Sequence, residues 1–440
     1  MKFEELPGIP ETWSSFLRAK MPFIPALPEV PEILAHAGSL RGQTGPRDAL
    51  CRQLAKGARL CYDQTRENLL RLQRPECVVV LTNFYPGLFG GPAFQLFKCL
   101  TTIKICEELA RHKLQPVPVC WISGDLPRAF SRWSIRILNN ESEICSLDLE
   151  NQELSDPLPG GRIEALLALM EETGRGNYDT EVLEILRSSF SPETTLAGAC
   201  AQLVAALMKE WGLIVLDPHS LDLKDAGCAA ALSTLPASVL QCSLLPVVAA
   251  VIDPFEVDAF TGAQSFLRDR KLVGPMAWPR ASATVLDSRS RRILDRYGLD
   301  LNRLYEGADA IITGILDAMP RGASEKLGKL KLETEERIAA LNSLCPGVGT
   351  LRGVADSGRE KIIFQLDRLR ENFETACKRK AEMVRRQISR TCNTLAPNGR
   401  IQERELGGIQ MLLRYSCAAL RPLYEKLNIL SREHQLIAMD

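Results

Sequence analysis

A strand, a glycine-rich loop, a helix and a second strand follow one another over residues 77–122, and this order limits the fold more than any other feature. Residues 77–82 form a short β-branched apolar run, which is typical of a strand buried on both faces. The glycine-rich segment 83–92 follows, and apolar residues then recur at helical spacing over 93–112. Residues 116–122 form a second apolar run. This βαβ order predicts a parallel sheet with helices on both faces, which is an α/β fold with a Rossmann-like core.

The same alternation continues further along the chain. Residues 193–210 have the pattern of a helix, and residues 212–217 and 244–253 have the pattern of two more buried strands. Asp217 and Asp253 each stand where one of these strands ends. Ligands of open parallel sheets bind beyond the carboxyl ends of the strands, so both aspartates are candidate site residues. The alternative is that each aspartate only caps the element that follows it.

The segments before residue 77 are expected to cover the core. Residues 7–31 are rich in proline and predict an extended arm that packs across a later domain. Residues 47–73 predict a single helix, because Leu50, Leu54 and Leu69 recur at helical spacing.

A charged helical hairpin is expected in the last third of the chain. Residues 324–344 and 358–395 carry apolar residues at heptad-like spacing, and a Pro-Gly segment separates them. Two such helices joined by a turn predict an antiparallel coiled coil. Lys380 and Gln387 fall on its seam, and polar seam residues often specify a partner. A homodimer contact and a purely intramolecular hairpin both fit this pattern.

Composition excludes several classes of function. The 54 basic and 54 acidic residues balance, which argues against a protein that coats nucleic acid or an anionic membrane. The chain contains no apolar run of about 18 residues, as a membrane span requires, and its N-terminus does not resemble a secretory signal. Its 14 cysteines include no CxxC pair, and its four histidines are scattered. We therefore expect a cytoplasmic protein with reduced thiols and no metal site.

The glycine-rich loop has two interpretations. Gly87, Gly90 and Gly91 precede a helix N-terminus, where backbone N–H groups can bind an anion, and Lys98 follows on that helix. The loop is neither a P-loop nor a dinucleotide fingerprint, so a tight turn in a crowded place explains the glycines equally well.

These segments resemble one known family. Residues 82–92 (Thr-Asn-Phe-Tyr-Pro-Gly-Leu-Phe-Gly-Gly-Pro), then Lys98 and the strand ending in Trp121-Ile122, are similar to the signature of the BshC family. That family has a T-G-Q-Q-x-G-L-F-x-G-P loop, a lysine on the next helix, and a strand followed by an E-D-H-D cluster. Further matches occur in the family's order at residues 211–218, 241–246, 253–256, 279–284 and 397–404.

The resemblance implies a fold and an activity. The fold is a Rossmann-like core related to nucleotidyltransferases, with a C-terminal coiled coil that supports dimers. The activity is that of a cysteine ligase of bacillithiol biosynthesis, which joins L-cysteine to glucosaminyl-malate through an amide, with ATP as the expected activator of the carboxyl. The site residues that it implies are Asp125, Glu256 and Arg280 for catalysis, Gly87, Gly90, Gly91 and Lys98 for the cofactor, and Trp121, Gln241, Ser282 and Asp217 for the substrate.

The chain departs from the family at polar positions. The family's G-Q-Q is Asn83-Phe84-Tyr85, and of its E-D-H-D cluster only Asp125 keeps a carboxylate, since Pro127 replaces the histidine. Cys242 replaces an aspartate, and residues 223–244 are shorter than the family's connecting region. Arg280 and Arg404 persist, although an arginine in such a motif also serves as a structural ion-pair clamp.

Three domains and three functions follow from these patterns. We expect a core with the N-terminal arm and the truncated insertion over 1–320, a coiled-coil hairpin over 321–396, and a helical segment over 397–440 that returns to the core. The favoured function is the cysteine ligase. The alternatives are a non-catalytic, dimeric binding protein of the same family, because proton transfer needs the lost polar groups, and a nucleotide-binding enzyme with another substrate.

Overall fold

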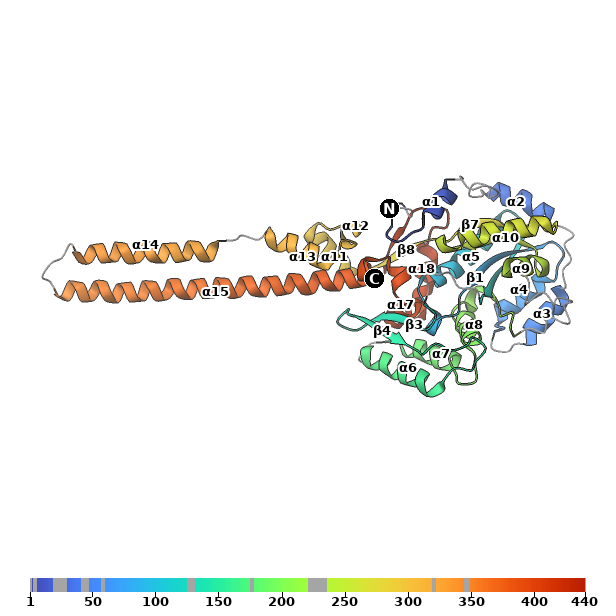
Figure 1. Cartoon of the computed structure of the whole chain (residues 1–440), viewed down its shortest axis with the longest axis horizontal. Helices are drawn as coiled ribbons and strands as arrows, with labels where there is room; N and C mark the ends of the chain where they lie inside the picture. Colours follow the sequence, from blue (N-terminus) through green and yellow to red (C-terminus); the bar gives the residue numbers. More distant parts are fainter. Residues whose placement is uncertain are drawn as a thin grey trace. The chain divides into compact units, whose positions relative to one another are not determined.

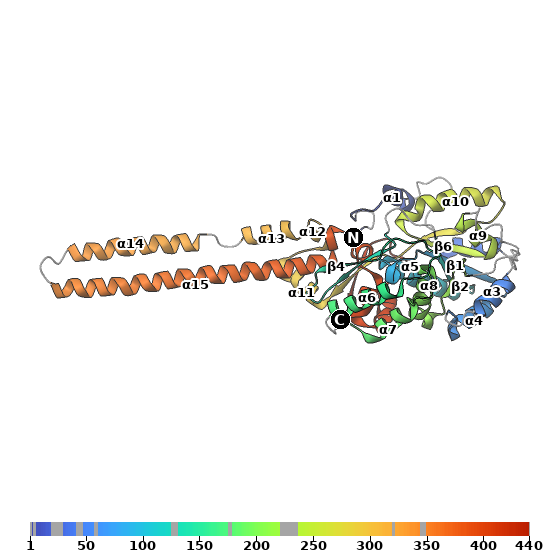
Figure 2. The same cartoon turned by 60° about the horizontal axis from the view of Figure 1, so that its bottom comes forward.

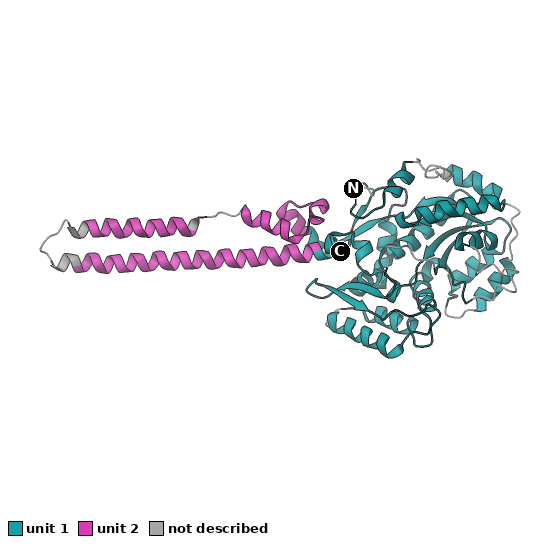
Figure 3. Cartoon of the chain, in the orientation of Figure 1, with its two compact units in different colours: residues 1–291, 393–440 teal, residues 292–392 magenta. Residues whose placement is uncertain are grey.

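The computed structural model describes residues 2, 6–18, 30–40, 47–56, 60–124, 131–174, 178–220, 236–318, 322–343 and 349–439. These residues form two compact units (Figure 3). Unit 1 contains residues 1–291 and 393–440, and unit 2 contains residues 292–392.

Unit 1 is built on a five-stranded, fully parallel sheet (Figure 1). The spatial order is β5-β2-β1-β6-β7. Counted along the chain, this is the 3-2-1-4-5 order of a doubly wound Rossmann fold. The sequence-based prediction of a Rossmann-like parallel core is therefore confirmed. The strands are β1 (Cys77–Phe84), β2 (Gln115–Ile122), β5 (Ile214–Leu216), β6 (Val247–Ile252) and β7 (Met276–Pro279).

Helices cover both faces of this sheet, as the two views in Figures 1 and 2 show. Alternate side chains of β1 and β2 enter different apolar clusters: Phe84 and Ile122 belong to one, and Leu81 and Trp121 to the other. The first cluster includes residues of α5 (Phe94–Arg111) and α8 (Leu196–Leu207), and the second includes residues of α3 (Arg47–Lys56), α4 (Asp63–Leu72) and α9 (Ala237–Leu244). Strands buried on both faces explain why these segments read as continuous apolar runs.

The N-terminal region differs from the prediction in two places. Residues 47–73 form two helices, α3 and α4, and not one, since Tyr62 is extended and stands before the first turn of α4. The helical spacing continued across the break because both helices place Leu50, Leu54 and Leu69 in the same apolar cluster. The expected extended arm includes the helix α1 (Glu11–Leu17), which buries Trp13 and contacts α10 (Val257–Asp269) and η4 (Pro254–Glu256). Residues 19–29 of the arm lie outside the described ranges.

Smaller elements complete unit 1. An antiparallel hairpin, β3 (Ser134–Leu138) and β4 (Ile144–Asp148), follows the second strand of the core. Near the C-terminus, β9 (Gln435–Met439) pairs in parallel with β8 (Ala283–Asp287). The remaining elements are α2 (Val30–Ser39), η2 (Leu88–Gly90), α6 (Gly160–Gly174), α7 (Thr180–Ser189), η3 (Lys209–Trp211), η5 (Pro397–Gly399), α16 (Gln402–Glu405), α17 (Gly408–Tyr415), η6 (Cys417–Ala419) and α18 (Leu420–Lys426).

Unit 2 contains the predicted helical hairpin. Its long helices are α14 (Ala323–Ser343) and α15 (Gly349–Leu395), and α11 (Ser288–Tyr297), α12 (Leu301–Leu304) and α13 (Ala308–Asp317) precede them. Ser324 hydrogen-bonds Glu374 at 2.6 Å, and Lys331 pairs with Asp367 at 2.7 Å. The residue number rises along α14 while that of its partner falls along α15, which confirms an antiparallel pair. The expected turn at 345–349 falls almost wholly outside the described residues. Among the described helices, none is long and apolar enough to cross a membrane.

Candidate functional site

A cavity lies where the strand order of the sheet reverses, between β1 and β6. The chain leaves β1 toward β2 on one side and returns to β6 on the other. In open α/β sheets this switch point leaves a crevice beyond the carboxyl ends of the strands. Here a cavity of about 200 Å³ has walls from these strand ends, α9, η4 and α10. It is the structural counterpart of the ligand site that a Rossmann-like fold predicts.

Polar side chains from two walls meet in this switch-point cavity. Gln241 of α9 donates from Nε2 to Oδ1 of Asn83, at 2.7 Å, and Ser123 lies on the same lining. Asn83 and Tyr85 face the cavity, whereas Phe84 between them is buried in the apolar cluster beneath α5. Of the three positions at which the chain departs from the family's G-Q-Q, two therefore alter the cavity and the third alters the core.

Glu256 closes one side of the cavity within a buried hydrogen-bonded group. Its Oε1 accepts from Lys98 Nζ at 2.5 Å and from the Tyr85 hydroxyl, and its Oε2 accepts from the Asp253 N–H at 2.6 Å. Lys98 is wholly buried and also lies 5.0 Å from the centre of the Tyr85 ring. A buried lysine requires such a counter-charge. The Lys98 ammonium is therefore directed at Glu256 and not at the glycine-rich loop.

The glycine-rich loop uses its N–H groups within the chain. Gly90 N donates to Gly87 O at 2.9 Å, Gly91 N to Leu88 O at 3.0 Å, and Leu88 N to Arg132 O at 2.9 Å. Gly90 has a φ of +87°, and a Cβ there would lie 2.9 Å from Leu203 Cδ2. Of the two interpretations of this loop, the geometry favours the tight turn, since these three donors are not directed at a ligand.

Asp253 and Arg280 are the centre of a second buried group of charges. Arg280 Nε lies 2.6 Å from Asp253 Oδ2, and its Nη1 lies 2.7 Å from Glu403 Oε1. Arg404 Nη1 approaches Asp253 Oδ2 at 2.8 Å. Burial would raise the pKa of Asp253, but the positive charges of Arg404 and Arg280 outweigh it and hold that pKa well below its usual range. Arg280 and Arg404 are thus ion-pair clamps that join β6 and β7 to α16.

Ser282 belongs to this group of charges and not to the cavity. Its hydroxyl donates to Glu403 Oε1 at 2.7 Å and lies 2.7 Å from His434 Nδ1. Thr284 hydrogen-bonds the other ring nitrogen of His434 at 2.8 Å. Burial lowers the pKa of His434 to about 4. This chain of contacts stands where β8 pairs with β9, so Ser282 fixes the C-terminal strand.

The other candidate residues are dispersed. Trp121 is 1% exposed and packs in the apolar cluster on the α4 side of the sheet. Asp217 follows β5 at the edge of the sheet, where its Oδ1 accepts the His219 N–H at 3.0 Å, as a cap does. Burial raises the pKa of Asp217, and the bond from His219 opposes this rise. Asp125 and Pro127 lie outside the described residues, as does most of the shortened segment 223–244.

The cysteines of the described ranges are unpaired thiols. Cys242, which stands where the family has an aspartate, is buried, and burial raises the pKa of its thiol to about 12. Cys200 donates to Gly87 O at 3.2 Å. Within the part of the chain that the structure describes, no three His, Cys, Asp or Glu side chains are grouped as a metal site.

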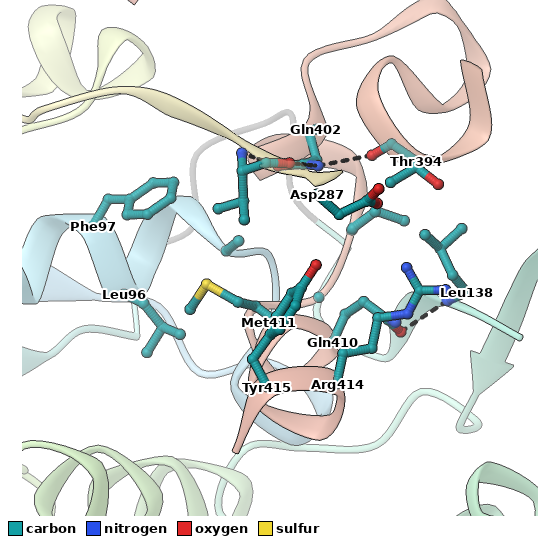
Figure 4. Close-up of a pocket in the computed structure, with 14 residues that line it drawn as sticks. Leu96, Phe97, Leu138, Asp287, Thr394, Gln402, Gln410, Met411, Arg414 and Tyr415 are labelled. Carbon is teal, nitrogen blue, oxygen red and sulfur yellow. Dashed lines mark hydrogen bonds between the residues drawn. The ribbon is translucent and has the colours of Figure 1, made fainter. Parts of the chain in front are cut away.

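A second cavity lies between α5 and α17 (Figure 4). Its volume is about 50 Å³, which is room for one or two water molecules and not for a substrate. Gln402 lines it. Its Oε1 accepts the Val285 N–H, and its Nε2 donates to Val285 O and, at 2.7 Å, to Thr394 O. Gln402 and Glu403 of the Gln402-Glu403-Arg404 motif are therefore structural.

Sequence reasoning missed Glu403, His434 and the pairing of Tyr85 with Glu256. Glu403 and His434 are 0% and 4% exposed. Glu403 directly precedes Arg404 in its motif, and His434 is an isolated histidine in the sequence. Their partners lie more than 100 residues away in the chain, and no local spacing carries such a signal.

Comparisons with known proteins agree with this architecture. Residues 34–237 match the family model described as "Bacillithiol biosynthesis BshC, N-terminal Rossmann-like domain". Residues 283–439 match "Bacillithiol biosynthesis BshC, C-terminal coiled-coil domain". Proteins named "Putative cysteine ligase BshC" from Salinibacter ruber and Koribacter versatilis are each 22% identical to the chain. The first alignment covers 86% of both proteins, and the second covers 89% of this chain and 90% of the relative. With both domains matched in order, the chain belongs to the BshC family.

Proposed function

We propose that the chain is a cysteine ligase that joins L-cysteine to glucosaminyl-malate through an amide bond. The observation that carries this proposal is the switch-point cavity, which keeps a polar lining of Asn83, Gln241 and Ser123 beside the strand ends of a BshC-type core. Its volume of about 200 Å³ is below that of typical cofactor pockets, so we assign it to cysteine and not to a whole nucleotide.

The reaction that we propose consumes ATP. The carboxyl carbon of cysteine forms a bond to the amino nitrogen of the sugar, and the carboxyl oxygen that it loses leaves with a phosphate group. The amine loses a proton as the amide forms, and a carboxylate can accept it. Asp125 is our candidate for that acceptor, because both oxygens of Glu256 are already hydrogen-bonded. Among the described residues, the glycine-rich loop does not offer the nucleotide the N–H groups that its sequence suggested.

Glu256 and Arg280 are positioning residues in this proposal. Glu256 holds Tyr85 on the cavity lining, and it fixes η4 through the Asp253 N–H. Arg280 acts through Asp253, at the other end of the same capping box. The loss of either side chain would change the shape of the cavity, even if that side chain does not touch the substrate.

The test is product formation from purified protein with cysteine, glucosaminyl-malate and ATP, measured by mass spectrometry. Gln241→Leu should raise KM for cysteine by about tenfold, the effect of one lost hydrogen bond to a charged group. Ser243→Ala is the matched control on the same helix, since among the described residues its hydroxyl donates to Val239 O, one turn earlier in that helix. If the two variants have equal KM values, the cavity is not the cysteine site.

A second function is supported by the closed contacts around Glu256. Lys98 and Tyr85 satisfy that carboxylate, and Gln241 donates to Asn83, so these polar groups of the lining already have partners within the chain. A non-catalytic binding protein of the same family fits this arrangement. Tyr85→Gln restores the family's residue at a position that faces the cavity. Activity that appears only in this variant would favour the binding protein, and activity in the unmodified chain would exclude it.

We also propose that the hairpin of unit 2 mediates a homodimer. Ile362, Phe364, Leu369 and Met383 of α15 are 46–61% exposed, which is unusual for large apolar side chains on one helix. Covering them with a second copy would remove this apolar surface from water.

A further inference from the structure

A further cavity formed by described residues of unit 1 is lined by arginines. Its volume is about 650 Å³, which is within the range of sites for small organic molecules. Arg136 of β3, Arg400 after η5 and Arg404 of α16 contribute to its walls, and Glu405 is the carboxylate among its lining residues. We call it the arginine cavity. Its lining therefore has more positive than negative charge.

Arg404 presents part of its guanidinium group to this cavity. Its carbon Cζ lies 4.0 Å from the ring centre of Phe255 and 4.7 Å from that of Phe94, so the group is stacked between two aromatic residues. Within the described part of the chain, its hydrogen bonds are all made by Nη1, to Asp253. A stacked guanidinium can donate further bonds only in its own plane, and here Nε and Nη2 supply them.

Glu405 holds the other two arginines at the cavity wall. This carboxylate is 7% exposed as a residue, and its Oε1 accepts from Arg136 Nη1 at 2.6 Å and from Asn398 Nδ2 at 2.8 Å. Its Oε2 lies 3.7 Å from Arg400 Nη1. One carboxylate cannot neutralise two guanidinium groups, so a positive charge is left for a ligand.

From these contacts we infer that the arginine cavity binds a small organic dicarboxylate. Carboxylates match the planar fork of an arginine, and the arginines form two groups: Arg136 and Arg400 at Glu405, and Arg404 between the two aromatic rings. The aromatic rings of Phe94 and Phe255 would contact the carbon skeleton between the two acidic groups. A single inorganic phosphate would leave most of the volume empty.

The arginine cavity adjoins the switch-point cavity, because Phe255 lines both. The inference deepens the proposed function, and the identity of the natural ligand rests on that function. The acceptor of the proposed ligase carries a malyl group, which is a dicarboxylate. The arginine cavity would hold that group while the sugar amine reaches the cysteine in the neighbouring cavity.

The experiment is isothermal titration of the full chain with succinate and with malate, at low and at high salt. We expect saturable binding that weakens as salt rises, because exposed charges are screened. Arg400→Gln should raise Kd for both dicarboxylates by about tenfold, the size of one charge-assisted contact. Arg400 is 69% exposed, so this variant should fold normally.

Arg66→Gln is the matched control, since Arg66 is 64% exposed and lies 3.8 Å from its own carboxylate, Asp63. Unchanged affinity in Arg400→Gln, an equal loss in Arg66→Gln, or phosphate that binds as tightly as malate would each overturn the inference. The ligase assay is separate from this test. Dicarboxylate binding without product would contradict the proposed reaction and leave the cavity assignment in place. Product without dicarboxylate binding would contradict the cavity assignment and leave the proposed reaction in place.

Discussion

Asp253 and Arg280 form an ion pair of 2.6 Å in which both side chains are at most 1% exposed. Asp253 ends β6 and caps η4, and Arg280 follows β7. Glu403 and Arg404 of α16 complete the group, so the pair joins the carboxyl edge of the sheet to the C-terminal segment. Because η4 and Phe255 form walls of both cavities, this ion pair fixes the geometry on which both assignments depend.

Arg280→Met should destabilise unit 1 strongly. It would leave Glu403 buried without this partner and Asp253 with Arg404 alone. Breaking a buried pair by removing one partner costs about 3–5 kcal/mol. Urea unfolding, followed by circular dichroism, measures the loss. The control Arg66→Met removes an exposed pair and should change the unfolding free energy by less than about 1 kcal/mol. Equal effects of the two variants would show that the buried group is not structural.

The stability of the chain should fall in mild acid because of His434. Burial lowers its pKa to about 4 in the folded chain, against about 6.5 when unfolded. Between these values the unfolded chain binds a proton that the folded chain does not, so acid favours unfolding. The contribution of neutral His434 to the unfolding free energy is fully present above pH 6.5 and is lost as the pH falls to 4. The total loss is about 3 kcal/mol.

Unfolding free energies of the wild type and of His434→Gln, measured from pH 7.5 to pH 4.5, test this point. Their difference should shrink as the pH falls, since only the wild type carries the penalty. His112→Gln serves as the control at an exposed histidine. A difference that is constant with pH would contradict the buried, neutral state of His434.

The fold requires a glycine at position 212. Its φ is +66°, and a Cβ there would lie 2.6 Å from the carbonyl oxygen of Gln64. Gly212→Ala should therefore cost about 2 kcal/mol of unfolding free energy through backbone strain and this contact. Gly161→Ala, at a helix position with nothing within 4 Å, should cost less than about 0.5 kcal/mol. Thermal unfolding of both variants decides whether the glycine is structural.

Four of the five core strands and their parallel direction were predictable from the sequence, and the charge clusters were not. Strands buried on both faces give apolar runs, and β1, β2, β5 and β6 appeared as such. The break between α3 and α4 was not predictable, because both helices pack on the same cluster and preserve the helical spacing. Arg404 lies 151 residues from Asp253, and no local pattern reports a contact of that kind.

The candidate site was predictable only in part. Asn83 lies near the carboxyl end of β1, where the fold rule for parallel sheets places a site, but its contact with Gln241 of α9 was not indicated. Lys98 was expected to face the glycine-rich loop, but a wholly buried ammonium needs a counter-charge, and Glu256 supplies it. The arginine cavity combines residues of five separate segments, so nothing in the order of the chain indicated it.

The hairpin should make the protein a dimer. Ile362→Glu with Leu369→Glu would place two charges, seven residues apart, on one exposed apolar face of α15 and should shift the mass from twice that of the chain to once. Glu371→Gln changes a charge at an exposed position on the other side of the helix and should leave the dimer intact. Sedimentation equilibrium gives the mass in each case. A wild-type monomer would show that the hairpin is only intramolecular.

The central claim is that this BshC family member makes the amide. The most direct measurement incubates purified chain with ATP, isotopically labelled cysteine and glucosaminyl-malate, and follows the labelled product by mass spectrometry. We predict ATP-dependent product, with a higher KM for cysteine in Gln241→Leu and an unchanged KM in Ser243→Ala. Folded protein that forms no labelled amide at saturating substrate would contradict the claim.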